Sequence, residues 1–320
     1  MKILIIKPSS FGDIVQAAPC AAALKQAYPQ CEISWVIFKQ WAPLLEIFPD
    51  IDKIIGWDRN SGIKGFFEVL KKVKETEYDF ILDLQGLFRS GLLAKLAKGK
   101  VKIGAPGMKE LSGLMIKEIE PQKAKINATL RNLETVNFIT GKKFTPEVHL
   151  KIDEQSVKEA GIMLSENKVP EKYFTLLPFA RGKGKDWSIE NYRILIDLLK
   201  EKYPQYGILI LGSKNDFGKI KNDNAIGGKV ADLCGKTDLK QLAAILSKSA
   251  LSVGADTGSM HLSSVLNVPS VFIFGVSDIN ETAPHIGRFS LFINKENPKE
   301  INNIRPEEIF TEIQKRVTET

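Results

Sequence analysis

Residues 250–266 read ALSVGADTGSMHLSSVL: a short apolar run, a polar glycine turn, and then a helical pattern. Strand, turn and helix in this order are typical of open α/β sheets. Such a turn aims backbone N–H groups and the positive end of the helix dipole at one point, which suits a phosphate. Asp256 and His261 add side chains that can hold a nucleotide. The alternative interpretation is an ordinary helix cap made by Asp256 or Thr257.

A second turn of the same kind lies at the start of the chain. Residues 1–6, MKILII, have the apolar character of a buried parallel strand, and residues 7–13, KPSSFGD, lead into a helical pattern. Asp13 follows Gly12 at the start of that helix. Its carboxylate is therefore predicted at the carboxyl edge of the first strand, where ligands of open α/β sheets bind. Alternatively, Asp13 only caps the helix, which contributes about 1 kcal/mol.

Strand-like and helix-like segments alternate along the whole chain, which predicts parallel sheets built from βαβ units. The composition changes near residues 165–170, SENKVP, and the alternation starts again at Tyr173. We therefore expect an α/β protein of two Rossmann-like, doubly wound domains, residues 1–168 and 169–320, facing each other across a central cleft. The last helix, from about residue 306 to 317, is a candidate to pack back on the first domain, although nothing in its sequence requires it.

Composition limits the class of protein. The 320 residues are 43% hydrophobic and 26% charged, as in an ordinary soluble protein, and no apolar stretch is long enough for a membrane span. The start of the chain lacks the pattern of a signal peptide, so we expect a cytoplasmic protein. The three cysteines, Cys20, Cys31 and Cys234, are scattered and are interpreted as reduced core residues.

The net charge of +7 is unevenly distributed. Residues 1–150 hold 22 Lys and Arg against 16 Asp and Glu, whereas residues 151–320 hold 23 against 22. The excess in the first half indicates a surface that meets an anion or an anionic membrane. Nucleic acid is not expected as a partner, because aromatic residues are not interleaved with the basic ones.

Several familiar motifs are incomplete, and they narrow the chemistry. Residues 182–187, GKGKDW, begin like a dinucleotide fingerprint but end in Trp, which disfavours NAD. Residues 235–237, GKT, resemble the end of a phosphate-binding P-loop, but Val230 stands where the upstream glycine is required. Asp50 and Asp52 are interpreted as turn residues before a strand. With only three histidines in the chain, we expect neither a metal nor another cofactor.

Four segments together closely resemble the bacterial ADP-heptose:lipopolysaccharide heptosyltransferases, glycosyltransferase family 9. They are residues 7–14, KPSSFGDI; 185–187, KDW; 235–239, GKTDL; and 256–261, DTGSMH. The resemblance runs nearly the whole length of the chain. Within the family, residues 83–90, DLQGLFRS, and 34–36, SWV, look most like heptosyltransferase I, which adds the first heptose to Kdo-lipid A.

This resemblance implies a GT-B fold in which the first domain binds the acceptor and the second binds the sugar nucleotide, ADP-heptose. It also implies an inverting transfer without a metal. Asp13 would be the general base, and Lys185 with the N–H groups of Thr257 and Gly258 would balance the charge of the departing diphosphate.

By the same pattern, Asp216 meets the ribose, Thr237 and Asp256 border the nucleotide, and His261 faces the phosphates or the donor sugar. The alternative for Asp216 is a plain turn residue. Ala180 and Arg181 replace small hydroxyl residues that many relatives have before the lysine. We expect this loop to contact phosphate through Arg181 or through its backbone alone.

The implied acceptor, Kdo-lipid A, carries phosphates and carboxylates, which gives a reason for the basic first half. The candidate acceptor residues are Ser10, Gly12, Arg59, Lys64, Gln85, Arg89 and Arg131. Solvated loop charges are the alternative for Arg59 and Lys64. Residues 104–114, with Met108 expected on the surface, are a candidate lipid contact. The resemblance places the protein at the cytoplasmic face of the inner membrane, peripherally associated.

Three other interpretations remain at this point. A heptosyltransferase II or III would act on a later core sugar. A sugar-nucleotide epimerase can use the same two-domain fold, but it would have no need of a basic acceptor face. A non-catalytic nucleotide-binding protein would keep the turn at residues 256–261 and have no use for Asp13.

Overall fold

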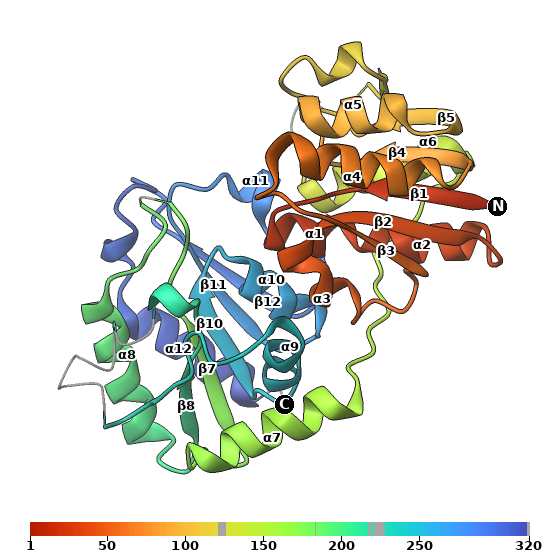
Figure 1. Ribbon diagram of the computed structural model, residues 1–320. Helices are drawn as coiled ribbons and strands as arrows, with labels where there is room; N and C mark the ends of the chain where they lie inside the picture. The colour runs from red at the N-terminus through yellow and green to blue at the C-terminus, as the bar shows by residue number, and fades with distance from the viewer. Residues whose placement is uncertain (121–125, 183, 217–218, 220–227, 319–320) are drawn as a thin grey trace. The chain divides into compact units, whose positions relative to one another are not determined.

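The computed structural model describes residues 1–120, 126–182, 184–216, 219 and 228–318. In the first half of the chain, parallel strands form one sheet with the order β3-β2-β1-β4-β5-β6 (Figure 1). They are β1 (Lys2–Ile6), β2 (Glu32–Phe38), β3 (Lys53–Trp57), β4 (Tyr78–Asp83), β5 (Gly99–Gly104) and β6 (Lys117–Glu118). Strand β1 is buried except for Lys2, because it has a neighbouring strand on each side and helices over its faces.

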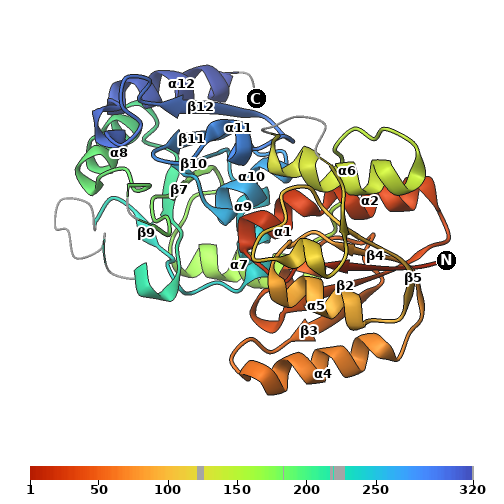
Figure 2. The same ribbon diagram turned by 90° about the horizontal axis from the view of Figure 1, so that it is seen from above.

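Helices cover both faces of this sheet. They are α1 (Phe11–Ala17), α2 (Pro19–Ala27), α3 (Ala42–Leu45), α4 (Gly62–Lys74), α5 (Phe88–Leu96) and α6 (Ala128–Thr140), with the 3-10 turns η1 (Lys39–Trp41) and η2 (Ser112–Leu114). Helices α1, α2 and α6 lie on one face, and α4 and α5 on the other (Figure 2). The first helical pattern forms two helices instead of one, because Pro19 has no N–H to continue the hydrogen bonding of α1.

The second half of the chain repeats this plan. Its strands are β7 (Tyr173–Leu177), β8 (Gly207–Ile210), β9 (Ala231–Asp232), β10 (Leu251–Ala255), β11 (Ser270–Phe274) and β12 (Phe289–Ile293). Its helices are α7 (Glu154–Glu166), α8 (Ile189–Lys202), α9 (Leu239–Ser247), α10 (Gly258–Val265), α11 (Ile279–Thr282) and α12 (Pro306–Thr318), with the 3-10 turns η3 (Lys214–Asp216) and η4 (Ile301–Asn303).

Both sheets have the doubly wound strand order. The second sheet runs β12-β11-β10-β7-β8-β9, so each sheet reads 3-2-1-4-5-6 when its own strands are counted along the chain. In this order the chain reverses direction between the first and fourth strands, and ligands bind outside the carboxyl ends of those strands. This reversal lies between β1 and β4 in the first sheet and between β7 and β10 in the second, and we call these two places the switch points. The prediction of two Rossmann-like units is thus confirmed.

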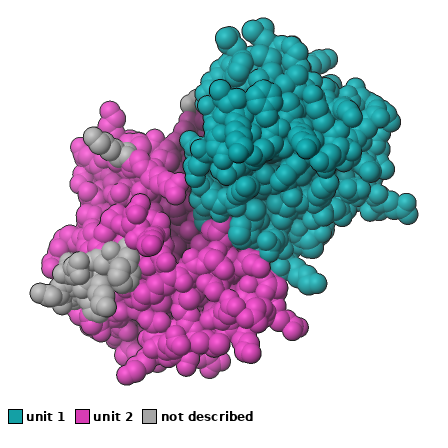
Figure 3. Space-filling model, viewed as in Figure 1, with its two compact units in different colours: residues 1–151 teal, residues 152–320 magenta. Residues whose placement is uncertain are grey.

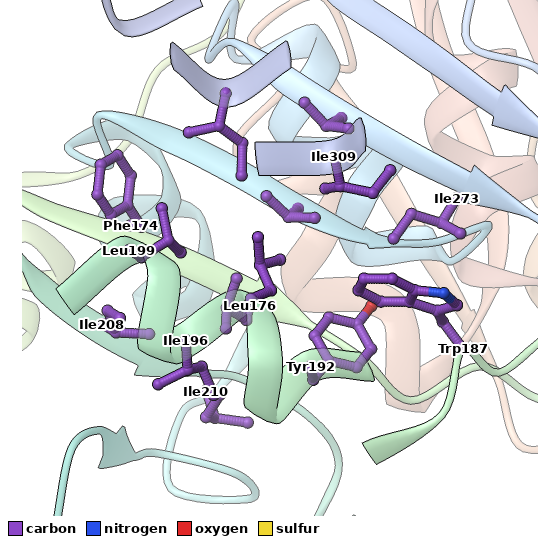
Figure 4. Packing of buried hydrophobic residues seen from close by; sticks show 14 of the residues in the cluster. Phe174, Leu176, Trp187, Tyr192, Ile196, Leu199, Ile208, Ile210, Ile273 and Ile309 are labelled. Atoms are coloured by element: carbon purple, nitrogen blue, oxygen red, sulfur yellow. The ribbon is translucent and has the colours of Figure 1, made fainter. Parts of the chain in front are cut away.

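The core of the second half shows how the loop after β7 is fixed. Residues from α8, the sheet and α12 interlock around Leu176, Tyr192 and Ile309 (Figure 4). Trp187 is buried in this cluster, and its indole N–H donates to the carbonyl of Ile304 at 3.0 Å. This anchor holds the loop that carries Lys185 in place.

The predicted domain boundary at residue 168 is wrong. The two compact units are Met1–Lys151 and Ile152–Thr320 (Figure 3). Helix α7 belongs to the second unit because it packs against α9. Helix α12, the candidate to pack on the first domain, buries Ile309 and Ile313 in the core of the second unit, against α8 and the sheet. In the described residues no helix combines the length and the apolar character needed to cross a membrane.

Candidate functional site

An ion cluster spans the switch point of the second unit. Lys185, from the loop after β7, places its Nζ 3.2 Å from Oδ2 of Asp256, directly after β10. The other carboxylate oxygen, Oδ1, lies 3.1 Å from Nε2 of His261, in the second turn of α10. The side chains of Asp256 and His261 are nearly buried, whereas Lys185 is 29% exposed. The cluster therefore presents the lysine as its accessible cation.

The charge state of Asp256 follows from these partners. Burial opposes its ionisation, but the hydrogen bond and charge of His261 and the charge of Lys185 outweigh burial and lower its pKa to about 2. An ionised carboxylate in turn fixes the orientation of both partners. Asp256 thus serves as the anchor of the cluster, and Lys185 as the group placed to meet an anion.

The N-terminus of α10 adjoins this cluster. Thr257 is the N-cap, and its hydroxyl accepts a hydrogen bond from the N–H of Met260 at 3.3 Å. The first intrahelical bond runs from the N–H of His261 to the carbonyl of Thr257, so the amide of Gly258 precedes the helical ladder. The positive end of the α10 dipole and the ammonium group of Lys185 therefore act on the same region, which suits the negative charges of a diphosphate.

The loop carrying Lys185 is tied back on itself. The carboxylate of Asp186 accepts a hydrogen bond from the N–H of Ala180 at 2.6 Å. Ala180 is half-buried, and Arg181 beside it is exposed. In the KDW motif, then, Asp186 closes the loop, Trp187 anchors it and Lys185 reaches the switch point.

Asp216 and Thr237 lie on neighbouring turns of the same sheet edge. Asp216 accepts from the N–H of Ser213 at 2.9 Å and from Nζ of Lys219 at 2.6 Å, so it organises the turn η3. Its pKa is lowered because these hydrogen bonds outweigh its burial. Gly235, two residues before Thr237, packs against the backbone of Lys214 in that turn. The structure thus brings both turns together, and it gives Asp216 the turn role considered as its alternative.

In the first unit, Asp13 lies at the N-terminus of α1. Its Oδ2 accepts hydrogen bonds from the N–H of Ser10 at 2.9 Å and from the hydroxyl of Ser10 at 2.6 Å. Gly12 lies between them in the first turn. The N-cap of α1 is therefore Ser10 and not Asp13, which stabilises the helix start from the first turn by accepting from Ser10. The half-buried carboxylate of Asp13 also lies at the carboxyl edge of β1. The two roles are compatible, because a helix N-terminus favours negative charge.

A buried lysine to which the sequence analysis assigned no role lies near Asp13. The side chain of Lys7 is buried, and its Nζ donates to the carbonyl of Leu84 at 3.0 Å. Burial lowers the pKa of Lys7, while the nearby negative charges of Asp13 and Asp83 raise it. Position 7 directly follows β1, in a segment interpreted as a turn, so only the fold shows that this ammonium points inward.

The loop after β4 meets the loop after β1. Oε1 of Gln85 accepts from the N–H of Ser9 at 3.2 Å, which joins the two loops across the switch point. Arg131, at the start of α6, is half-buried near Gly107 and contributes positive charge at Lys7. The structure therefore gathers Ser10, Asp13, Gln85 and Arg131 around one sheet edge.

The remaining acceptor candidates are more peripheral. Arg59 is exposed and lies over the ring of Phe38, with 5.6 Å from its guanidinium carbon to the ring centroid. Lys64 and Arg89 are exposed in the first turns of α4 and α5. Met108 is not on the surface as expected, because it is half-buried over Gly104.

The matched family model covers residues 66–308 and describes glycosyltransferase family 9 (heptosyltransferase). The chain is 26% identical to the lipopolysaccharide core heptosyltransferase OpsX of Haemophilus influenzae, over 88% of this chain and 81% of that protein. It is also 26% identical to lipopolysaccharide heptosyltransferase 1 of Campylobacter coli, over 95% and 92% of the two chains.

Solved structures agree on the fold. The family 9 glycosyl transferase of Veillonella parvula superposes with a TM-score of 0.88 at 19% identity, covering 100% of this chain and 97% of the other. Escherichia coli heptosyltransferase WaaC with ADP gives a TM-score of 0.81 at 22% identity, covering 99% and 100%. The fold is therefore the GT-B fold expected from the sequence. With the family model matching most of its length, this chain belongs to glycosyltransferase family 9, the heptosyltransferases.

Proposed function

We propose that this glycosyltransferase transfers heptose from ADP-L-glycero-D-manno-heptose to Kdo-lipid A of the lipopolysaccharide inner core, with inversion and without a metal ion. The observation that carries the proposal is the Lys185–Asp256–His261 cluster at the N-terminus of α10. Relatives are named as lipopolysaccharide heptosyltransferases, and one solved relative holds ADP, which supports the donor class.

On the donor side, Lys185 would pair with the diphosphate of the sugar nucleotide. As the bond between the anomeric carbon and the diphosphate oxygen breaks, negative charge grows on ADP, and the ammonium and the N–H groups of Thr257 and Gly258 balance it. Asp256 holds the side chains of Lys185 and His261 in position for this contact. The fixed positive groups supply the electrostatic stabilisation that a divalent cation gives in other enzymes.

On the acceptor side, Asp13 would act as general base. The acceptor hydroxyl attacks the anomeric carbon from the face opposite ADP, and its proton passes to the carboxylate of Asp13 as the new glycosidic bond forms. A carboxylate at a helix N-terminus is a weak base, so it accepts the proton late, when the attacking oxygen has become acidic in an oxocarbenium-like transition state.

Cationic side chains support an anionic acceptor. Arg131 is half-buried near Lys7, and Arg59, Lys64 and Arg89 are exposed on the same unit. These groups suit the phosphates and carboxylates of Kdo-lipid A. We assign the subtype to heptosyltransferase I on the residues 83–90 and 34–36, and the acceptor assay below decides between this subtype and heptosyltransferase II or III.

The test measures ADP release from ADP-heptose in the presence of EDTA, with Kdo-lipid A and heptosylated Kdo-lipid A as separate acceptors. We expect release with Kdo-lipid A alone, and a product whose anomeric configuration, read by NMR, is inverted. Asp13→Asn keeps an oxygen for the bonds from Ser10 but removes the base, so its rate should fall about 100-fold or more. Asp153→Asn is the matched control, because the carboxylate of Asp153 also accepts from the N–H and the hydroxyl of one serine, Ser156, at a helix N-terminus outside the site.

Each part of the proposal has its own contrary result. Release only with the heptosylated acceptor would move the assignment to heptosyltransferase II or III. Loss of activity in EDTA that Mg²⁺ restores would refute the metal-independent mechanism. Equal rates for Asp13→Asn and wild type would show that Asp13 is a helix cap and nothing more.

A further inference from the structure

One face of the first unit exposes an unusual number of large apolar side chains. Helix α5 lies between α4 and η2 and contacts both (Figures 1 and 2). Among the described residues, twelve large apolar side chains are exposed; five of them lie on these three elements, and a sixth, Leu111, directly precedes η2. We call this the α4–η2 surface; its apolar members are Ile63, Phe67, Phe88, Leu96, Leu111 and Leu114.

Helix α4 carries a second apolar stripe besides the one it packs on the sheet. Its inner side chains, such as Val69 and Val73, are buried in the core of the first unit. Ile63 and Phe67, one turn apart, are 77% and 61% exposed on the outer side. Along the same side, Phe67, Lys71 and Lys74 line a surface hollow of about 360 Å³. Burial in the fold therefore does not account for the outer stripe.

The η2 segment presents its leucines on a fixed backbone. Leu111 and Leu114 are 72% and 73% exposed. The turn between them is held to the loop after β4, because the hydroxyl of Ser112 donates to the carbonyl of Gly86 at 3.0 Å. The N–H of Lys109 donates to the same carbonyl at 2.7 Å. Two leucines at the tip of an anchored turn form a suitable element for shallow insertion into an apolar layer.

Positive charge surrounds these apolar side chains. Residues 59–114 contain eleven Lys and Arg against six Asp and Glu. Lys64, Lys71 and Lys74 are exposed on α4, and Lys109 is exposed beside Leu111. Isolated apolar side chains set among lysines fit an anionic bilayer, whose headgroups attract the amines while the apolar side chains enter the acyl boundary. A protein interface is a poorer fit, because lysine is depleted there.

We propose that the α4–η2 surface docks this protein on an anionic phospholipid bilayer, with Ile63, Phe67, Leu111 and Leu114 inserted and the surrounding lysines at the headgroups. The inference goes beyond the proposed function, because it assigns the peripheral membrane association that the resemblance implies to particular apolar side chains of the first unit, which take no part in the proposed transfer reaction. Docking needs neither a sugar nucleotide nor Kdo-lipid A.

Flotation of the full-length protein with vesicles tests the proposal. Vesicles of phosphatidylcholine alone are compared with vesicles in which about one-third of the lipid is phosphatidylglycerol, at low and high salt. We expect binding to the anionic vesicles, weakened by salt. Ile63→Ser with Phe67→Ser, and separately Lys71→Gln with Lys74→Gln, should each weaken binding roughly tenfold or more.

A matched control lies on the opposite face of the same unit. Phe138 in α6 is 54% exposed, and Lys142 follows that helix on the surface. Phe138→Ser with Lys142→Gln should leave binding unchanged. All these positions are exposed, so circular dichroism should show a retained fold in every variant.

Three results would overturn the proposal. In the first, the protein does not bind anionic vesicles. In the second, Phe138→Ser with Lys142→Gln weakens vesicle binding as much as the α4 variants do. In the third, neither α4 variant weakens vesicle binding. Sedimentation in the absence of lipid adds a fourth: a dimer broken by Ile63→Ser with Phe67→Ser would assign the surface to a second copy of this chain. Transfer to a soluble acceptor, measured in parallel, keeps failure of docking separate from failure of the enzymatic assignment.

Discussion

Two buried acids occupy matching positions in the two units and titrate in opposite directions. Asp83 ends β4 and Asp256 follows β10, and each of these is the fourth strand of its unit. Asp83 accepts from the N–H of Gln85 and the hydroxyl of Ser90, which are neutral donors, and burial raises its pKa to about 6. Asp256 has Lys185 and His261 as partners, and its pKa is about 2. The charge of Lys7 also lowers the pKa of Asp83, but burial outweighs it, whereas the groups that contact Asp256 outweigh its burial.

Asp83 should make the protein less stable as pH rises. Between its unfolded pKa near 3.8 and its folded pKa near 6, the folded state holds the proton that the unfolded state has lost, so the free energy of unfolding falls with increasing pH. From about pH 4.5 to about pH 7 we expect a loss of about 2 kcal/mol from this group. Urea unfolding of wild type and Asp83→Asn at both pH values measures it.

The variant isolates the effect from other titrating groups. An amide at position 83 still accepts from Gln85 and offers N–H to Ser90, and it carries no charge to bury. The difference in unfolding free energy between variant and wild type should therefore grow with pH. A difference that stays constant would mean that Asp83 is ionised throughout the range. Asp256 acts in the opposite sense, since its stabilisation is lost only as pH falls from about 4 to about 2.

At this scale the sequence reveals residues that lie in compact motifs and hides those that the fold brings in. Asp256 and His261 were predictable because five positions of strand-turn-helix sequence bring them together. Lys185 required the resemblance to a family, since its partner lies 71 positions away. Lys7 begins the segment 7–14 that carries the resemblance, but nothing there assigned it a role, because a lysine after a strand is usually solvated and only the bond to the carbonyl of Leu84 shows that it points inward.

Helix α10 is docked on its sheet by hydroxyl groups as well as by apolar packing. Ser263 in α10 donates to Ser252 in β10 at 2.7 Å, and Ser252 bonds to Thr175 in β7 at 2.7 Å. All three side chains are buried. Because hydrogen bonds require defined geometry, this series of hydrogen bonds fixes the position of α10 on its sheet. It thereby fixes the position of the turn that carries Asp256.

Mutating the two serines should show coupling. Ser252→Ala and Ser263→Ala both remove the hydrogen bond between these two serines. Ser252→Ala also removes the bond to Thr175, and Ser263→Ala the bond from Ser270, so each should cost about 1 to 2 kcal/mol of unfolding free energy. The double variant should cost less than the sum, with a coupling of about 1 kcal/mol. Denaturant unfolding of wild type, the two single variants and the double variant completes this double-mutant cycle.

The control pairs Ser252→Ala with Ser247→Ala. The hydroxyl of Ser247 bonds within its own helix, to the carbonyl of Ala244, and shares no partner with Ser252. These two changes should be additive. Additivity of the Ser252 and Ser263 changes as well would show that the hydroxyl chain does not act as a unit.

Sequence patterns located most elements but misjudged those whose role depends on distant partners. The apolar run at residues 1–6 predicts a strand, because both faces of a central parallel strand are buried, and β1 lies there. Helix α7 looks like the end of the first domain, since it precedes the composition change at residues 165–170. Its assignment to the second unit depends on contacts with α9, more than 70 residues later, and local sequence does not record them.

At the scale of the whole molecule, the two units have separate cores. The cluster around Leu4, Trp57 and Ile81 lies entirely within residues 1–151, and the cluster around Leu176, Tyr192 and Ile309 lies within residues 152–320. Each unit has its own complete sheet and its own switch point. A ligand held by one unit is therefore expected to stabilise that unit more than the other, because only its unfolding releases the ligand.

We expect ADP to shift one of two thermal transitions. At a concentration about 100 times its Kd, ADP adds about 2.7 kcal/mol to the unit that binds it, which for a unit of this size raises its Tm by roughly 5 to 10 °C. Calorimetry measures both transitions. Three of the four tryptophans, Trp35, Trp41 and Trp57, lie in the first unit, so fluorescence follows that unit chiefly and should change little.

Paired lysine variants identify the unit that responds. Lys185→Met removes the accessible cation of the Asp256 cluster and should abolish the shift, whereas Lys64→Met, an exposed lysine of the first unit, should leave it intact. If ADP raises both transitions equally in wild type, the units unfold together and their separate cores do not make them independent. If Lys185→Met keeps the full shift, the nucleotide is held by other groups, and the electrostatic role given to the lysine in the transfer reaction fails with it.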